Sequence, residues 1–241
     1  MSIIGINGRI GSGKDTIGNI IQYLTSEYKD KYEYSDWTDR VENYGSKTYS
    51  PWEIKKFAGK LKQIASLLTG IPIEDFEDQE FKKSYLGSEW GTVQQVPLNS
   101  IPPFADMQFN SLMSVREFLQ KLGTDAVRNG LHENAWVNAL FADYRGPKMS
   151  EYNPSNWIIT DMRFPNEMEA VAERKGITIR VVRSFNHKMG SKETGTLDLT
   201  PLHPSETALD DAKFDYEIIN DGSIEDLIEK VKQILITEKI I

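Results

Sequence analysis

The residues that most constrain this chain lie close to its amino terminus, where a short apolar run leads into a glycine-rich segment. Residues 3–6 are typical of a buried strand, and residues 8–16 have the sequence GRIGSGKDT. Apolar residues with helical spacing then follow, at Ile17, Ile20, Ile21 and Leu24. A strand, a glycine-rich turn and a helix in this order form the setting of a phosphate-binding loop.

The residue types of this segment suit the binding of an anion. Its glycines let the backbone turn closely around a phosphate, so that successive N–H groups point inward. The amino terminus of the following helix adds unpaired N–H donors and the positive end of a dipole. Lys14 supplies a mobile charge for the outer phosphates of a nucleoside triphosphate. We therefore predict an ATP site that includes Gly8, Arg9, Gly11, Ser12, Gly13, Lys14, Asp15 and Thr16. The alternative is a glycine-rich turn that binds no ligand.

One position departs from the usual pattern of such loops. The residue after the lysine, which is ordinarily a serine or threonine that holds Mg²⁺, is Asp15, and Thr16 stands one place later. Asp161 ends a short apolar run at the place where related loops have a second acidic residue. We predict that Asp15, Thr16 and Asp161 hold the metal, although Asp161 in isolation also fits a helix cap.

Spacing along the rest of the chain predicts an α/β fold with a parallel sheet of about five strands and helices on both faces. The expected strands are residues 3–6, 52–57, 157–160, 177–182 and 216–219. The expected helices are residues 14–28, 58–68, 133–144 and 165–175. Another is expected to follow Ser114, which forms a capping box with Glu117, and the last is expected to begin at about residue 224. Residues 29–51 and 74–111 show no sustained period, and residues 184–204 have the composition of a mobile loop or lid.

Two arginines follow expected strand ends, where ligands collect in parallel sheets. Arg163 and Arg183 offer planar contacts to phosphate oxygens and can neutralise charge on a phosphoryl group in transfer. With Lys14 they are our candidate catalytic residues. The competing interpretation for each arginine is a surface ion pair.

Composition narrows the function classes. The 241-residue chain has a net charge of −8, which argues against a nucleic-acid polymer as partner. It contains no cysteine, so disulfides and thiolate chemistry are excluded. Charged residues interrupt the first apolar run too early for a secretory signal, and no stretch approaches the roughly 18 apolar residues that span a bilayer. We expect a cytoplasmic protein without a membrane partner.

Several blocks of this sequence resemble the bacteriophage deoxynucleoside monophosphate kinases. The GKDT ending of the loop is similar to theirs, and the other similar blocks keep the family's order along the chain. They are residues 57–62, 114–116 with Gln120 and 123–125, 136–137, 161–163 with Glu167, 181–183, and 219–223. Residues 29–51 and 74–111 match poorly, which leaves the preferred base open.

The resemblance implies a single P-loop kinase domain over residues 1–241, with acceptor-binding insertions at about 70–150 and a lid at about 184–204. It implies transfer of the γ-phosphate of ATP to a deoxynucleoside monophosphate, with Mg²⁺ as cofactor, in a homodimer, and in the host cytoplasm if a phage encodes the chain. The residues that would line the acceptor site are Leu61, Lys62, Arg116, Gly123, Trp136, Asp161 and Glu167. Two alternatives stay open: a P-loop kinase for another acceptor, such as dephospho-coenzyme A or phosphomevalonate, and a nucleotide-binding module without transferase activity.

Overall fold

A computed structural model describes residues 3–45, 48–94, 109–145, 155–183 and 204–241. The chain forms two compact units. The first comprises residues 1–57 and 140–241, and the second comprises residues 58–139. Each unit has a hydrophobic core of its own.

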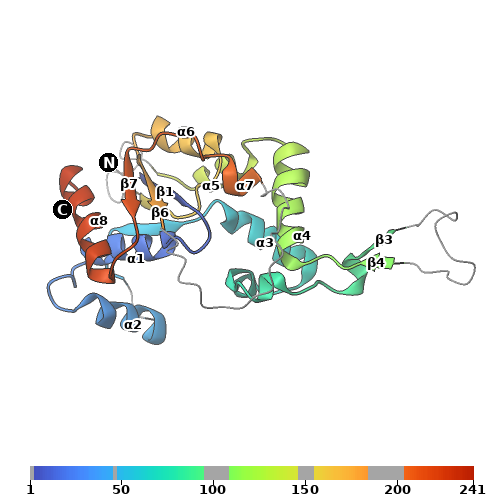
Figure 1. Ribbon diagram of the computed structural model, residues 1–241, viewed down its shortest axis with the longest axis horizontal. Helices are drawn as coiled ribbons and strands as arrows, with labels where there is room; N and C mark the ends of the chain where they lie inside the picture. The colour runs from blue at the N-terminus through green and yellow to red at the C-terminus, as the bar shows by residue number, and fades with distance from the viewer. Residues whose placement is uncertain (1–2, 46–47, 95–108, 146–154, 184–203) are drawn as a thin grey trace, which may run out of the picture. The chain divides into compact units, whose positions relative to one another are not determined.

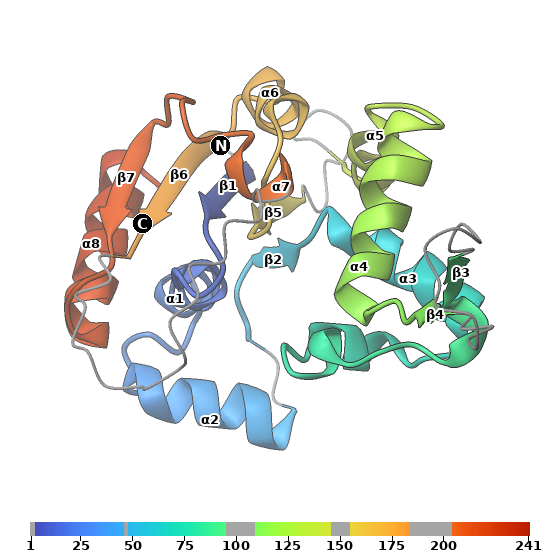
Figure 2. The ribbon, with the colours of Figure 1, turned by 45° about the vertical axis from the view of Figure 1, so that its right-hand side comes forward.

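The first unit is built on a five-stranded parallel sheet in the order β2-β5-β1-β6-β7. Its strands are β1 (Ile3–Gly8), β2 (Trp52–Lys55), β5 (Asn156–Ile159), β6 (Ile177–Val182) and β7 (Tyr216–Ile219). Figure 1 and Figure 2 show β1 at the centre of this sheet. All five strands were predicted from the sequence, each to within about two residues.

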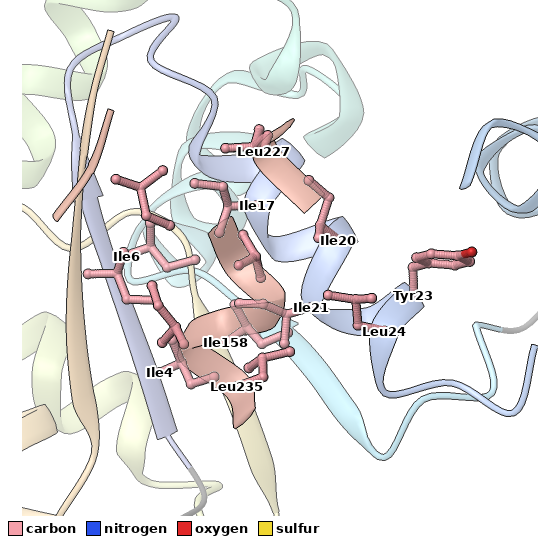
Figure 3. Packing of buried hydrophobic residues seen from close by; sticks show 14 of the residues in the cluster. Ile4, Ile6, Ile17, Ile20, Ile21, Tyr23, Leu24, Ile158, Leu227 and Leu235 are labelled. Atoms are coloured by element: carbon pink, nitrogen blue, oxygen red, sulfur yellow. The ribbon is translucent and has the colours of Figure 1, made fainter. Parts of the chain in front are cut away.

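Helices cover both faces of the sheet, as predicted. Successive side chains of a strand point to opposite faces. Ile4 and Ile6 of β1 pack into one core with α1 (Lys14–Leu24) and α8 (Ile224–Thr237), as Figure 3 shows. The intervening Gly5 instead faces Val171 of α6 (Pro165–Glu173), on the other face. The amino-terminal strand is therefore buried from both sides.

The prediction for residues 14–28 was too long at its carboxyl end. The helix α1 stops at Leu24, because the Thr25 hydroxyl donates to the Ile21 carbonyl at 2.7 Å and the Ser26 hydroxyl donates to the Tyr23 carbonyl at 2.8 Å. Hydroxyl groups that bond to nearby carbonyls in this way compete with the helical hydrogen bonds of the backbone.

Residues 29–51 show no sustained period in the sequence, but they are not without regular structure. A helix, α2 (Tyr34–Tyr44), lies within this stretch. Its only buried residue is Trp37, whose ring packs against the rings of Tyr23 and Tyr34 at centroid distances of 5.7 and 6.2 Å. Only Tyr34, Trp37 and Val41 follow a helical spacing on the side that packs on the core, which is too few for a wide apolar stripe in the sequence.

The second unit is mostly helical. It contains α3 (Ala58–Thr69), the short 3₁₀ turns η1 (Ile73–Glu77), η2 (Phe81–Lys83) and η3 (Ser88–Trp90), and the antiparallel pair β3 (Thr92–Gln94) and β4 (Phe109–Ser111). Then follow α4 (Val115–Gln120), which continues as the π-helix η5 (Lys121–Asn129), and most of α5 (Ala135–Phe141). Its core is formed by Ala65, Phe76, Leu86, Val115 and Phe118. The predicted Ser114 cap is confirmed, because its hydroxyl accepts from the Glu117 N–H at 3.1 Å.

Residues 95–108, 146–154 and 184–203 lie outside the described part of the chain, and with them almost all of the predicted lid. The structure resumes with α7 (Pro204–Thr207). Within the described residues, no helix has the length and the apolar character needed to cross a bilayer.

Candidate active site

The glycine-rich segment connects the end of β1 to the start of α1, as the sequence predicts. Gly13 precedes the helix with φ +102°, and Gly11 has φ +76°. Both values lie in the left-handed region that side-chain-bearing residues rarely adopt. The first intrahelical bond runs from the Ile17 N–H to the Gly13 carbonyl, so the N–H groups before it have no partner within the helix. These donors are available to an anion.

Side chains from three elements bind carbonyl groups of this loop. The Lys14 ammonium donates to the Arg9 carbonyl at 2.8 Å, and the Arg183 guanidinium, just past β6, donates to the Gly11 carbonyl at 3.1 Å. The Asn220 amide, just past β7, donates to the Ser12 carbonyl at 2.9 Å. Arg183 is thus placed at the loop, where its predicted contact with phosphate requires it.

The hydroxyl group of Ser12 is buried and unsatisfied. Ser12 is 3% exposed, and its Oγ has no hydrogen-bond partner among the residues that the structure describes. Buried hydroxyl groups are normally bonded, so an orphan next to backbone donors indicates a place where a ligand oxygen belongs.

Asp15 is held by two neighbouring strand ends. Its Oδ1 accepts from the Thr160 hydroxyl at 2.8 Å and lies 3.3 Å from the Lys56 ammonium. Burial raises the pKa of the Asp15 carboxyl, but the Thr160 hydrogen bond and the charges of Lys56 and Lys14 outweigh it, and the pKa lies below its usual value. Asp15 is therefore a carboxylate at neutral pH.

The second acidic candidate also has a structural contact. Asp161 follows β5, and its Oδ1 accepts from the Phe57 N–H at 2.7 Å. No group of three or more metal-ligating side chains occurs in the described residues. Mg²⁺ in kinases needs only one or two carboxylates besides phosphate oxygens and water. The oxygens of Asp15, Thr16 and Asp161 fit that requirement, and their contact with a metal stays a prediction.

A cavity of about 290 Å³ lies beside the loop, lined by β1 and β6 residues and by the segment that contains α7. Four arginines line it: Arg9, Arg163, Arg180 and Arg183. Two carboxylates balance part of this charge. Glu206 forms an ion pair with Arg163, and Asp210 lies 3.0 Å from Arg9 and 3.5 Å from Arg180. A cavity with this excess of guanidinium groups suits a phosphorylated ligand.

The same charges act on Lys14. Burial lowers the pKa of its ammonium group, and the positive charge of Arg163 lowers it further. The carboxylates of Asp15, Glu206 and Asp161 oppose this shift without cancelling it. Lys14 and Arg163 therefore act on one another within the same charged site.

Most of the predicted acceptor residues lie in the second unit, where the structure brings three of them together. The Trp136 indole donates to the Gly123 carbonyl at 2.8 Å, and the Leu61 side chain packs against Gly123. Lys62, which is 7% exposed, pairs with Glu77. Arg116 donates to the Gln79 side chain at 3.3 Å. Their role in the acceptor site stays a prediction.

Glu167 lies in the first unit and is buried. Its Oε2 accepts from the N–H groups of Arg163 and Phe164, at 2.7 and 3.2 Å. Glu167 therefore caps α6 and fixes the backbone of the predicted catalytic Arg163, and its contact with the acceptor stays a prediction.

Sequence reasoning missed several residues that contact this site: Lys56, Thr160, Arg180, Glu206, Asp210 and Asn220. Thr160 and Lys56 directly follow strands, and this position at the carboxyl end of a strand was a signal that they could belong to the site. Glu206 and Asp210 follow an expected lid, where the sequence offers no such signal.

Comparisons with known proteins agree with this geometry. Residues 68–231 match the family model of deoxynucleotide monophosphate kinase. A deoxynucleotide monophosphate kinase of Escherichia phage RB69 is 28% identical over 261 residues, which cover 98% of this chain and 100% of that protein. A deoxynucleoside-5'-monophosphate kinase of Escherichia phage T5 is 24% identical, over 90% of this chain and 89% of that protein. A deoxynucleotide monophosphate kinase of Enterobacteria phage T4 is 34% identical over 122 residues, which cover 51% of this chain and 45% of that protein. The chain belongs to the deoxynucleotide monophosphate kinase family.

Proposed function

We propose that this enzyme transfers the γ-phosphate of ATP to the phosphate group of a deoxynucleoside monophosphate, giving ADP and the deoxynucleoside diphosphate. The observation that carries the proposal is the loop of residues 8–16, which presents unpaired N–H groups and the unsatisfied Ser12 hydroxyl beside a cavity with four arginines. Family membership supports the same reaction.

The chemistry needs positioning and charge neutralisation more than proton transfer. The acceptor is a phosphate monoester with a second pKa near 6, so it is already a dianion at neutral pH and needs no general base. The loop would hold the donor phosphates in line with the acceptor oxygen. Lys14, Arg163 and Arg183 would neutralise the negative charge on the transferring group.

Two ligand-free contacts have to change for this to happen. The Lys14 ammonium is bonded to the Arg9 carbonyl, and the Arg163 guanidinium is paired with Glu206. Phosphate oxygens would replace the Arg9 carbonyl at Lys14, since charge-assisted bonds to phosphate are stronger than a bond to a neutral carbonyl, and they would compete with the Glu206 carboxylate for Arg163. Mg²⁺, held by Asp15, Thr16 and Asp161, would neutralise charge on the β- and γ-phosphates.

A coupled assay of ADP formation across a panel of acceptors tests the proposal. The panel contains dGMP, dTMP, dCMP and dAMP, with dephospho-coenzyme A and phosphomevalonate as the competing acceptors. We expect turnover with at least one deoxynucleotide. Turnover with a non-nucleotide acceptor alone would contradict the proposal, and nucleotide binding without any acceptor-dependent turnover would favour the binding module.

Lys14→Ala tests the site within the same assay. We expect its rate to fall to less than a tenth of the wild-type rate, because Lys14 would contact the transferring group. Lys232→Ala is the control, since Lys232 lies on α8 in a surface ion pair with Glu229. A Lys14→Ala rate above a tenth would remove the loop from the catalytic centre.

We also propose that this enzyme is a homodimer and that it is located in the host cytoplasm. The described residues present no membrane-spanning helix. Full-length relatives from phages RB69 and T5 support a phage-type enzyme. Sedimentation of the purified chain tests the dimer, and a monomer at micromolar concentration would contradict it.

A further inference from the structure

The phosphate-binding loop is held in shape from a second strand end. The Asn220 side-chain amide donates to the Ser12 carbonyl at 2.9 Å, across 208 positions of the chain. Asn220 immediately follows β7, the strand at the edge of the sheet, and β7 pairs with β6 rather than with β1. The contact therefore links the loop to an element that its own strand does not touch.

The position of Asn220 is itself fixed by the backbone on both sides. Its N–H donates to the Val182 carbonyl at 2.7 Å, which extends the pairing of β6 with β7 by one residue. Ser223 then caps α8, because its hydroxyl accepts from the Asp226 N–H at 3.2 Å and its N–H donates to the Asp226 carboxylate at 3.0 Å. The Asn220 side chain projects from a short connection that is anchored at both ends.

Loop and side chain are fitted to each other at Gly13. A Cβ atom at this position would lie 2.5 Å from the Asn220 Nδ2, closer than any side chain permits. Gly13 is thus constrained both by its φ of +102° and by the approach of Asn220.

The bond to the Ser12 carbonyl determines where the next N–H points. The Ser12 carbonyl and the Gly13 N–H belong to one planar trans peptide group, in which C=O and N–H point in opposite directions. A carbonyl directed at Asn220 therefore directs the Gly13 N–H away from Asn220. Without this bond the peptide group is free to rotate, and the orientation of that donor has to be fixed when a ligand binds.

We propose that Asn220 is a positioning residue for nucleotide binding, which orients the Ser12–Gly13 peptide group so that the Gly13 N–H is directed at a nucleotide phosphate before the nucleotide arrives. This inference rests on the proposed function. Asn220 contacts the loop and not the reacting atoms, so its loss acts on the affinity for ATP and ADP.

The experiment compares two variants of Asn220 with a control in the same connection. Asn220→Ala removes the donor, and Asn220→Asp keeps the shape of the side chain but cannot donate. Ser223→Ala removes the hydroxyl cap of α8 three residues away and keeps both the Asn220 side chain and the bond of its N–H to the Val182 carbonyl. Calorimetry measures ADP binding, thermal unfolding measures stability, and hydrogen exchange follows the amides of residues 8–16 in the ligand-free chain.

We expect both Asn220 variants to bind ADP about tenfold more weakly than the wild type, with faster exchange in residues 8–16. The Ser223→Ala variant should have a lower melting temperature, and its ADP affinity should lie within about twofold of that of the wild type. ADP affinity and loop exchange equal to wild type in Asn220→Asp would overturn the inference. So would an equal loss of ADP affinity in Ser223→Ala.

Failure of the proposed function looks different. In that case the wild type shows no turnover with any deoxynucleotide, but it still binds ADP more tightly than Asn220→Asp does. A wild type that turns over and two Asn220 variants that match it would overturn the positioning role alone.

Discussion

Asp15 stands where most phosphate-binding loops have a hydroxyl residue, and its surroundings show how a carboxylate is kept there. Thr160 and Lys56 both contact its Oδ1. A carboxylate held by a hydroxyl and an ammonium stays charged and fixed in direction, which is what support of a metal requires.

Asp15→Asn tests this role. We expect the Mg²⁺ concentration for half-maximal rate to rise several-fold, because an amide is a weaker ligand and loses the pair with Lys56. The measurement is the initial rate as a function of free Mg²⁺. Asp39→Asn, an exposed residue of α2, is the control. An unchanged requirement in Asp15→Asn would assign the metal to Thr16 and Asp161.

The lowered pKa of Lys14 predicts a pH dependence of nucleotide binding. In the proposed function Lys14 binds phosphate as an ammonium ion, and its pKa in the free protein lies below the ordinary 10.5 because of burial and Arg163. ADP affinity should therefore be constant at neutral pH and fall as the pH rises through this lowered pKa. Calorimetry of ADP binding between about pH 8 and pH 10.5 checks it, since the terminal phosphate of ADP, with a second pKa near 6, is already fully ionised in that range. Constant affinity up to pH 10.5 would contradict the prediction.

The site residues that the sequence identified are close together in the chain or near a strand end, although Lys56, Thr160 and Asn220 also follow strand ends and were missed. Lys14 and Asp15 follow from local spacing, and Asp161, Arg163 and Arg183 follow from apolar runs. Asn220 and Asp210 reach the loop from about two hundred positions away, and Glu206 pairs with Arg163 across 43 positions. A single sequence contains no signal for such contacts, because they depend on which strands become neighbours.

Among the elements, α2 is a helix that the apolar periodicity of the sequence does not reveal. Its polar faces lie in solvent, and Trp37, 2% exposed, packs it against the core together with the partly buried Tyr34 and Val41. The indole Nε1 has no partner among the described residues, so the contribution of Trp37 comes from packing and burial. Elements with a wide apolar stripe, such as α8, were predictable for the opposite reason.

Trp37→Ala should therefore destabilise the protein without changing the site. We expect a loss of about 3 kcal/mol in the free energy of unfolding, typical of a large aromatic removed from a core. Denaturant unfolding measures it, and ADP affinity should stay within about twofold of wild type. Tyr44→Ala, at an 80% exposed position of the same helix, should change stability by less than about 0.5 kcal/mol. Equal effects of the two substitutions would show that α2 does not pack as described.

At the scale of the whole molecule, the sequence predicted the sheet and its approximate size but not the division into units. The second unit spans residues 58–139 and has its own core around Phe76 and Phe118. Its apolar residues come from short turns and from a helix that changes to π geometry. None of these produces a long regular period, so periodicity does not mark this unit in the sequence, and the acceptor-binding insertions at about 70–150 that the resemblance implies stay a prediction.

The central position of β1 has a consequence for how the protein is made. Ile4 pairs with Ile158 on one side and with Ile177 on the other, so both neighbours of the first strand are synthesised more than 150 residues after it. Contacts between residues this far apart in the sequence form late, and they make folding slower. Chains stalled on the ribosome before residue 177 should therefore not be retained by immobilised ADP, whereas released full-length chains should be. We therefore expect the glycine-rich loop to leave the ribosome early and to acquire its shape near the end of synthesis.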